Sequence, residues 1–322
     1  MFSMKSRAAL FVVLSSMCLR VFAAEGGTGV NLLGMKNPGA AITPAQGFYY
    51  QNDLYFYSGN LDGGRGLPTG GKVVANVDAT AIVNLSTLLW STPWVIGGGR
   101  LNLSTTVPVG EKRISAGAQL AGPRIGTLGN STSDNVFTVG DPAVGAVLGW
   151  QAGHLYWQAG VSVNVPVGDY RSGDIANLAF HRWGTDLIGS GTWFDPNVGL
   201  DLSGTVGVTF NGRNPETDYR TGAELHVDWS ASQYFTRRFS AGLVGYYYQQ
   251  LTPDSGSGAV LGDFEGRVAA IGLTSAYIFK PGRIPITARL KVFHEFAVSN
   301  RAKGNSLFLT MTLPFSAPNG TP

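Results

Sequence analysis

Histidine is the side chain that most often supplies acid, base or metal-binding chemistry at neutral pH, and the sequence contains four. They are His154, His181, His226 and His294, and no two lie at a spacing typical of metal ligands. The glycine run at 97–99 lies within a strand pattern, without the strand, loop and helix that phosphate binding requires. The sequence therefore predicts no catalytic residue, no metal site and no cofactor.

A lipase built on a membrane sheet is the main enzymatic alternative. It would need a serine and a histidine within hydrogen-bonding distance on the lipid side, together with a polar partner that orients the histidine. His294 is the candidate base, because it falls on the outward parity of its strand near the outer rim. No serine hydrolase motif accompanies it, and imidazole tolerates a half-wet position at headgroup depth. We therefore interpret His294 as an interface residue and predict that the protein is not an enzyme.

A second set contains charged and aromatic residues. They occupy alternate positions of their predicted strands, so their side chains are expected on the same face of the sheet. If these residues share the inner face of one barrel that closes by pairing its first strand with its last, Asp53 lies only two strands from Lys291. Opposite charges then meet near the waist beside apolar ring faces. Such a surface suits an aromatic solute that carries a polar substituent. The alternative is that the charges pair and simply fill the interior, as side chains do in small barrels. The candidate lumen-facing residues are Asp53, Asp78, Tyr156, Glu224, Asp228, Tyr246, Tyr248, Arg289, Lys291 and Phe293.

These positions depend on strands, and residues 154–168 give the clearest strand pattern. Apolar residues at odd positions from Leu155 to Val165 alternate with polar or small residues from Tyr156 to Asn164. The run is long enough for a tilted strand to cross a bilayer, which takes about nine to eleven residues. In the stretch from Val73 to Leu85, apolar residues likewise alternate with polar ones, including Asp78, and we expect the polar side to face the lumen.

Tight and loose connections alternate along the chain from residue 47 onward. Outer-membrane barrels have short turns on the periplasmic side and longer loops outside, so this alternation predicts about twelve strands with both ends periplasmic. The tight connections are expected at 91–93, near 153, near 203–204, at 236–238 and at 281–283. The loose ones are expected at 59–71, 109–138, 167–190, 212–218, 251–263 and 299–304. The predicted fold is an all-β, transmembrane, antiparallel up-and-down barrel.

Composition agrees with a membrane barrel. Charged residues make up 13% of the chain, about half the share usual in soluble domains. The formal net charge is +3. Mean hydropathy is only +0.07, which argues against a set of spanning helices. No basic cluster or charge run indicates a nucleic-acid surface. The predicted location is the bacterial outer membrane.

The chain divides into four predicted regions. Residues 1–23 read as a cleaved signal peptide, because Lys5 and Arg7 precede an apolar run and small residues follow it. Residues 24–46 form a Gly- and Pro-rich N-terminal segment, either a flexible periplasmic tail or a plug of the barrel mouth. The barrel spans 47–315, and 316–322 is a C-terminal tail. The alternating last strand, which ends at Phe315, resembles a signal for the barrel assembly machinery.

Four motifs taken together resemble one known family. They are Val165-Pro166-Val167-Gly168-Asp169-Tyr170, VGDP at 139–142, TWFDPNVG at 192–199 and the N-terminal GVNLLGMKNPGAAITPAQGFYYQNDLYFY. Their order and spacing are similar to those of the "MetA-pathway of phenol degradation" proteins. The resemblance implies an outer-membrane barrel, distantly similar to long-chain fatty acid transporters, and an association with uptake of aromatic or other hydrophobic compounds.

The expected function is an outer-membrane channel for passive uptake of small hydrophobic or aromatic compounds. The expected partners are outer-membrane lipid, the solute and the barrel assembly machinery, and no nucleic acid. The alternative is a structural or adhesive surface barrel with a closed lumen.

Overall fold

The computed structural model describes residues 28–67, 71–122, 126–259, 265–282 and 284–315, so the predicted signal peptide and C-terminal tail lie outside it. Among these residues, no helix is long and apolar enough to cross a membrane. The regular structure consists of thirteen β-strands. They are β1 Gly47–Leu67, β2 Gly71–Ile96, β3 Gly99–Gly122, β4 Gly126–Val139, β5 Ala143–Ala152, β6 Leu155–Asn164, β7 Gly184–Asp195, β8 Leu200–Asn211, β9 Glu224–Tyr234, β10 Phe239–Gln250, β11 Arg267–Phe279, β12 Ile286–Ser299 and β13 Lys303–Pro314.

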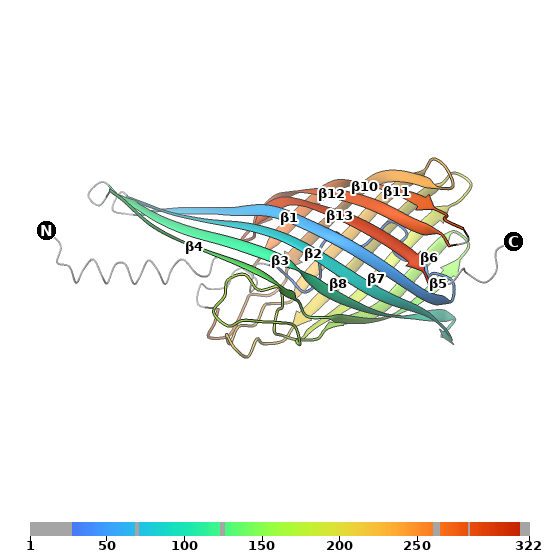
Figure 1. Cartoon of the computed structure of the whole chain (residues 1–322), viewed down its shortest axis with the longest axis horizontal. Helices are drawn as coiled ribbons and strands as arrows, with labels where there is room; N and C mark the ends of the chain where they lie inside the picture. Colours follow the sequence, from blue (N-terminus) through green and yellow to red (C-terminus); the bar gives the residue numbers. More distant parts are fainter. Residues whose placement is uncertain (1–27, 68–70, 123–125, 260–264, 283, 316–322) are drawn as a thin grey trace.

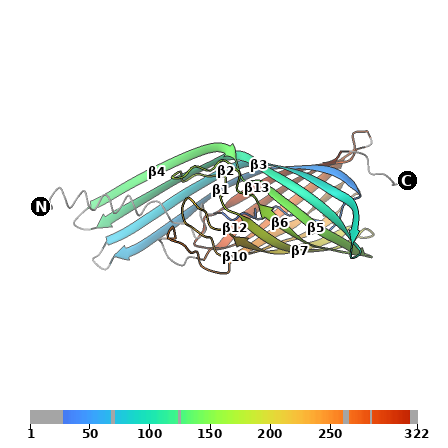
Figure 2. The same ribbon diagram turned by 90° about the horizontal axis from the view of Figure 1, so that it is seen from below.

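Twelve of these strands close into an antiparallel barrel. Each strand pairs with its neighbours in chain order, except that β3 pairs with β5, and the ring closes where β1 pairs with β13. The thirteenth strand, β4, pairs only with the outer part of β3 (Figure 2). The predicted barrel of about twelve strands is thereby confirmed, with one additional strand outside the ring.

The strands from β5 to β13 show the expected difference between the two faces. In β8 every second residue is buried, beginning with Asp201 and including Thr205 and Thr209, whereas Leu202 and Val206 on the other parity are exposed. The polar residues face inward and the apolar residues face outward. This is the arrangement of a barrel wall between lipid and a polar interior.

The strands β1, β2 and β3 are longer than the rest and, with β4, extend beyond the ring (Figure 1). They have 21, 26 and 24 residues, compared with 10 to 14 in the other strands. The predicted loops at 59–71 and 109–138 are therefore wrong over most of their length. Small hydroxyl and glycine residues in these stretches suggested loops, but the backbone continues in paired strands.

The predicted orientation of β2 is also wrong. Val77 is buried with 2% exposure, whereas Asp78 is exposed on the opposite face of the sheet. Val77 packs in a hydrophobic cluster with Ile114 of β3, Val136 of β4 and Ala176 of the loop after β6. Because that loop covers the inner face of the extension with apolar side chains, the apolar parity of β2 turns inward and the polar parity turns out.

The turns β2–β3, β5–β6, β7–β8, β9–β10 and β11–β12 lie at one end of the barrel, together with the start of β1 and the end of β13, and we call this end the short-turn end. The β2–β3 turn is formed by Gly97 and Gly98, whose φ angles of 55° and 77° are typical of a two-residue hairpin turn. The prediction of a turn at 91–93 and the placement of 97–99 within a strand are therefore wrong. The β7–β8 turn ends at Gly199 rather than at 203–204.

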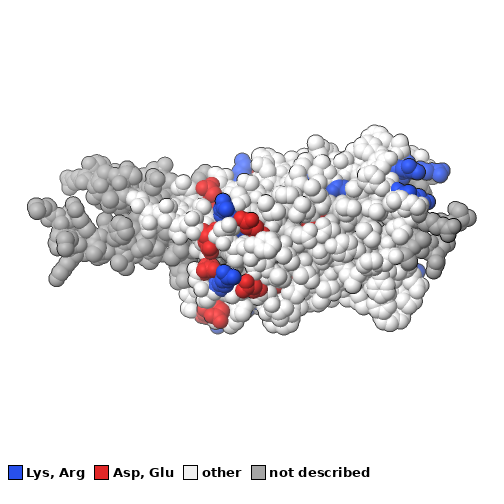
Figure 3. Space-filling model, in the orientation of Figure 1, with Lys and Arg blue, Asp and Glu red and all other residues white. Residues whose placement is uncertain are grey.

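Aromatic side chains pair with one another at this short-turn end. Phe48 stacks on Trp90 with ring centroids 5.5 Å apart, and Trp150 stacks on Trp157 at 6.3 Å. Charged side chains are nearly absent from the wall seen in Figure 3 and gather in a band near the extension and at the opposite end. The result is an apolar belt between two polar rims, as expected for a barrel that spans a bilayer.

Candidate functional site in the barrel lumen

The N-terminal segment 28–46 lies inside the barrel. Its backbone N–H groups donate hydrogen bonds to inward-facing side chains: Gly34 to Asp228 of β9 at 2.8 Å, and Ala41 to Thr192 of β7 at 3.1 Å. Near the short-turn end, the Ser91 hydroxyl of β2 donates to the Pro44 carbonyl oxygen at 3.0 Å. The segment therefore contacts the wall from several sides along its length.

Lys291 of β12 makes three hydrogen bonds with the backbone of this segment. Its ammonium group donates to the carbonyl oxygens of Gly34, Met35 and Lys36 at 2.6, 2.9 and 3.3 Å. The side chain has no exposed surface, and its Nζ lies 4.6 Å from the centroid of the Phe308 ring. A buried ammonium needs several acceptors, and these three carbonyls supply them.

Two carboxylates compensate the charge of Lys291, as predicted from the strand order for one of them. Asp53 lies on β1, two strands from β12 across β13, and is fully buried. It accepts hydrogen bonds from Thr310 at 2.5 Å and from Gln51 at 2.7 Å. The charges of Asp53 and Asp228 both act on Lys291. Opposite charges are therefore close together around the N-terminal segment.

An aromatic compartment lies beside this charge cluster. It is defined by Tyr246 and Tyr248 of β10, Phe293 of β12 and Phe308 of β13, and Leu33 of the N-terminal segment fills it. The rings of Tyr246 and Phe293 are 5.1 Å apart, and those of Phe293 and Phe308 are 6.1 Å apart. The two tyrosines and two phenylalanines thus form one buried cluster with Leu33, and Leu32 and Met35 of the segment pack against it.

The hydroxyl groups of both tyrosines donate hydrogen bonds to carboxylates. Tyr246 donates to Glu295 at 2.8 Å, and Tyr248 donates to Glu224 at 2.6 Å. The guanidinium of Arg301 lies 4.3 Å from the Tyr248 ring centroid. The compartment therefore combines an apolar surface with polar groups at its rim, which is the composition of sites that bind small organic molecules.

Glycine is required where the segment passes this compartment. Gly34 has a φ angle of +76°, and a Cβ atom there would lie 2.9 Å from the Phe293 ring. A side chain at this position would be strained in the backbone and would press against the aromatic wall. The close approach allows the Gly34 carbonyl oxygen to reach Lys291.

The structure brings most of the predicted residues together, with two exceptions. Asp78 lies on the outer face of the extension, so its assignment to the lumen is wrong for the reason given for β2. Tyr156 faces inward near the short-turn end, where Gln151 donates to its hydroxyl at 2.9 Å, away from the aromatic compartment. The residues around the segment and compartment are Asp53, Glu224, Asp228, Tyr246, Tyr248, Lys291 and Phe293, and Arg289 also faces inward, donating to Thr274 at 3.3 Å.

Sequence reasoning missed three polar residues of the lumen. His226 and Asp186 form a buried pair with 2.9 Å between Nε2 and Oδ1, and Glu295 accepts from Tyr246. Asp186 lay in a stretch predicted to be a loop. Glu295 could have been found, since it follows Lys291 and Phe293 on the same parity of one strand.

The family assignment comes from a match over most of the barrel. The model of the family described as "Putative MetA-pathway of phenol degradation" matches residues 64–311. The chain belongs to this family. The family predicted from the motifs is therefore confirmed, and the match covers β2 to β12 in full, the end of β1 and most of β13.

A solved structure shares the fold of this family member. The COG4313 outer membrane channel from Pseudomonas putida F1 has a TM-score of 0.67 at 16% identity, over 87% of this chain and 99% of that chain. A FadL homologue from Pseudomonas aeruginosa has a TM-score of 0.44 at 10% identity, over 92% of this chain and 98% of that chain. No curated protein matches the chain. The protein is a closed β-barrel of the outer-membrane type.

Proposed function

We propose that the protein is a channel for passive uptake of small hydrophobic or aromatic compounds, and that its N-terminal segment is the gate. The observation that carries the proposal is the position of Leu33. This side chain occupies a compartment walled by Tyr246, Tyr248, Phe293 and Phe308, inside a closed barrel. Removal of the segment would uncover these rings, and an aromatic solute is the kind of molecule that would replace Leu33.

The composition of the lumen supports a solute with an apolar body and a polar substituent. Ring faces favour apolar and aromatic surface through burial and through edge-to-face contacts. Lys291 lies next to the compartment and, after withdrawal of the segment, would lose its three carbonyl acceptors. A phenolate or carboxylate substituent would then satisfy the ammonium group. This chemistry favours anionic or hydroxylated aromatics over plain hydrocarbons.

Disulfide locks test whether the segment gates the channel. The only cysteine of the sequence is Cys18, in the predicted signal peptide, so engineered thiols have no competitor in the barrel. A Cβ atom built at Gly184 of β7 would lie 3.4 Å from the Val30 Cβ, close to the separation found in disulfides. We expect the oxidised Val30→Cys/Gly184→Cys variant to show no solute flux in liposome swelling, and reductant to restore wild-type flux.

A second lock provides the matched control. A Cβ atom at Gly149 of β5 would lie 3.3 Å from the Thr43 Cβ, only four residues before the start of β1 at Gly47. Oxidised Thr43→Cys/Gly149→Cys should leave the segment free around Leu33 and conduct like the reduced form. Unchanged flux with the Val30 lock closed, verified by mass, would refute gating by the segment.

A structural or adhesive barrel with a closed lumen is the alternative. It predicts no swelling with aromatic solutes in either redox state, and equal growth of strains with and without the gene on aromatic carbon sources. We favour the channel because the P. putida relative with the same fold is described as an outer membrane channel. On the same ground we propose that the protein is not an enzyme, and that lipid and the barrel assembly machinery are its partners in the membrane.

A further inference from the structure

The outer wall carries a row of polar residues that crosses five neighbouring strands. Strand register places His294 of β12 opposite Asn305 of β13, and Asn305 opposite Ser58 of β1. The row continues from Ser58 to Thr80 of β2 and from Thr80 to Arg113 of β3. All five side chains are exposed on the outward face. At about 4.8 Å per strand the row is about 19 Å long.

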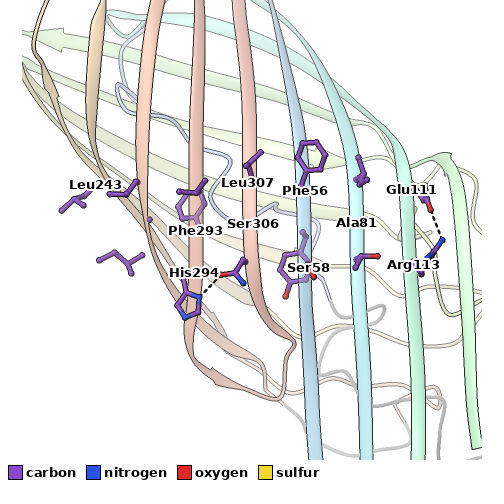
Figure 4. A pocket seen from close by; sticks show the side chains of 18 residues that line it. Phe56, Ser58, Ala81, Glu111, Arg113, Leu243, Phe293, His294, Ser306 and Leu307 are labelled. Atoms are coloured by element: carbon purple, nitrogen blue, oxygen red, sulfur yellow. Dashed lines mark hydrogen bonds and ion pairs between the residues drawn. The ribbon is translucent and has the colours of Figure 1, made fainter.

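The next row toward the membrane centre is mostly apolar. It consists of Val292, Leu307, Phe56 and Ile82 in register, followed by Glu111. Both rows line one hollow of the outer surface with a volume of about 980 Å³. Figure 4 shows His294, Ser58 and Arg113 along one edge, with Leu307 and Phe56 beside them. The hollow thus has a polar edge and an apolar floor.

The depth of the polar row identifies the membrane surface that it faces. On β1, Ser58 is ten residues from Phe48, which belongs to the aromatic belt at the short-turn end. Ten residues of a strand tilted by about 40° rise about 25 Å, the height of the apolar band of outer-membrane barrels. The polar edge therefore lies at the headgroups of the opposite leaflet, which is the outer leaflet when the short turns are periplasmic.

The side chains of the row are hydrogen-bonding groups rather than a charge cluster. His294 Nδ1 and the Asn305 amide oxygen form a hydrogen bond of 2.8 Å, so the other ring nitrogen and the amide nitrogen are left for a ligand. Ser58 and Thr80 add hydroxyl groups. Arg113 lies 3.7 Å from Glu111 with 59% of its side chain exposed, a long surface ion pair that a stronger anion can replace.

We propose that this hollow binds a phosphorylated, acylated sugar of the outer leaflet, the chemistry of the lipid A part of lipopolysaccharide. Amide, imidazole and hydroxyl groups suit sugar hydroxyls, and the guanidinium of Arg113 suits a phosphate. The apolar floor takes acyl chains. A phospholipid could fill the floor, but its headgroup would leave most of a polar row about 19 Å long without contacts.

Binding of defined lipids to the purified full-length barrel in detergent tests the proposal. Native mass spectrometry gives dissociation constants for diphosphoryl lipid A, dephosphorylated lipid A and phosphatidylglycerol. We expect diphosphoryl lipid A to bind most tightly, dephosphorylated lipid A less tightly and phosphatidylglycerol least tightly. Arg113→Gln should weaken diphosphoryl lipid A binding about tenfold, the value of one charge-assisted hydrogen bond, and leave the dephosphorylated form unchanged.

Matched variants separate this site from general lipid binding. Arg213→Gln removes another exposed arginine, which pairs with Asp218 in a loop outside the hollow, and should leave all three affinities unchanged. Ile82→Trp fills the floor without adding charge and should weaken both sugar lipids. Heat-modifiable gel mobility shows that each variant is folded. Equal affinity for lipid A and phosphatidylglycerol would overturn the proposal, as would equal losses in Arg113→Gln and Arg213→Gln.

Discussion

The two sides of the barrel differ in how their outer ends are completed. On the side of β8 to β11, the strands stop. The β8–β9 loop closes on itself through the bridge Asn214–Tyr219 and joins the β10–β11 loop through the bridge Arg220–Ser255. On the side of β1 to β4, the strands continue past the ring as a paired extension. We call these the short-strand side and the long-strand side. One side is finished by loop contacts, and the other by sheet hydrogen bonds.

The same two sides also differ in the residues that face inward. In β8 and β9 of the short-strand side, the inner face is polar, as Thr205 and Asp228 illustrate. On the long-strand side, Val77, Val83 and Leu85 of β2 face inward. An alternating strand thus reveals that it has two different faces, but the neighbours inside the barrel decide which face turns inward.

The largest effect should follow removal of the two inward cations of β12. Arg289→Ala/Lys291→Ala removes Lys291 from Asp53 and Asp228 and removes Arg289 from Asp201, a loss of about 3–5 kcal/mol for a broken buried pair. The lumen also becomes more negative. We expect a lower urea midpoint, a reversal potential in planar bilayers shifted toward cation selectivity, and slower uptake of anionic aromatics relative to neutral ones.

The control for this change is an uncharged inward residue of the long-strand side. Leu85→Met conserves volume and should leave the reversal potential unchanged. If the double alanine variant folds, as its heat-modifiable mobility would show, but keeps the wild-type reversal potential and uptake, Arg289 and Lys291 do not line the conducting path.

The second prediction concerns lipid exposure of the two sides. Val206 faces outward near the middle of β8 and is 49% exposed. Val206→Arg should destabilise the barrel by about 2–4 kcal/mol, because the cation would lie at the membrane midplane. Asp78→Arg, on the outer face of the extension, should change stability by less than about 0.5 kcal/mol. Equal losses in urea unfolding from liposomes would contradict the placement of the extension outside the bilayer.

Sequence reasoning succeeded where one physical signal was sufficient. Long alternating strands such as β6 and β8 require two different environments, so the barrel and its strand number were predictable. The family motifs could also be recognised, because each is a short local pattern. Lys291 and Asp53 were placed near each other because strand order fixes which strands become neighbours when a barrel closes.

The errors arose where distant parts of the chain decide the outcome. The inward turn of Val77 depends on Ala176, a residue of a loop far along the sequence. The extension was mistaken for loops because Ser, Thr and Gly residues between 109 and 138 carry little hydrophobic pattern. Contacts of the N-terminal segment could not be predicted either, because a segment without periodicity gives no register.

A smaller effect is expected from a polar pair on the lipid-facing side of the long strands. Asn52 of β1 and Asn84 of β2 face outward and exchange two amide hydrogen bonds of 3.0 and 3.1 Å. Asn52→Leu alone leaves the Asn84 amide without this partner and should cost about 1–2 kcal/mol, whereas the double leucine variant should be near neutral. A double-mutant cycle by urea unfolding measures the coupling. Additive losses would show that the amides act independently.

The smallest expected effect is on the loop contacts that complete the short-strand side. Asp218, in the β8–β9 connection, accepts hydrogen bonds from the hydroxyl and backbone N–H of Ser257 at 2.6 and 3.0 Å. These bonds, with the smaller effect of the nearby Arg213 charge, lower the pKa of Asp218 from its usual value of 3.8. A carboxyl whose pKa is lowered by folding stabilises the folded loop above its unfolded pKa, and this contribution is lost as the pH falls through the folded pKa.

We therefore expect the contact between the two loops to be intact above a pH of about 4 and to weaken progressively below it. Hydrogen exchange of the Ser257 amide should accelerate in acid beyond its intrinsic pH dependence. Asp218→Asn should abolish that excess, because the amide has no charge to lose. The sheet amides of the long-strand extension, which have no such carboxylate acceptor in the strand pairing, should show no comparable excess. An equal acid response in both regions would mean that loop contacts and strand pairing do not complete the barrel in different ways.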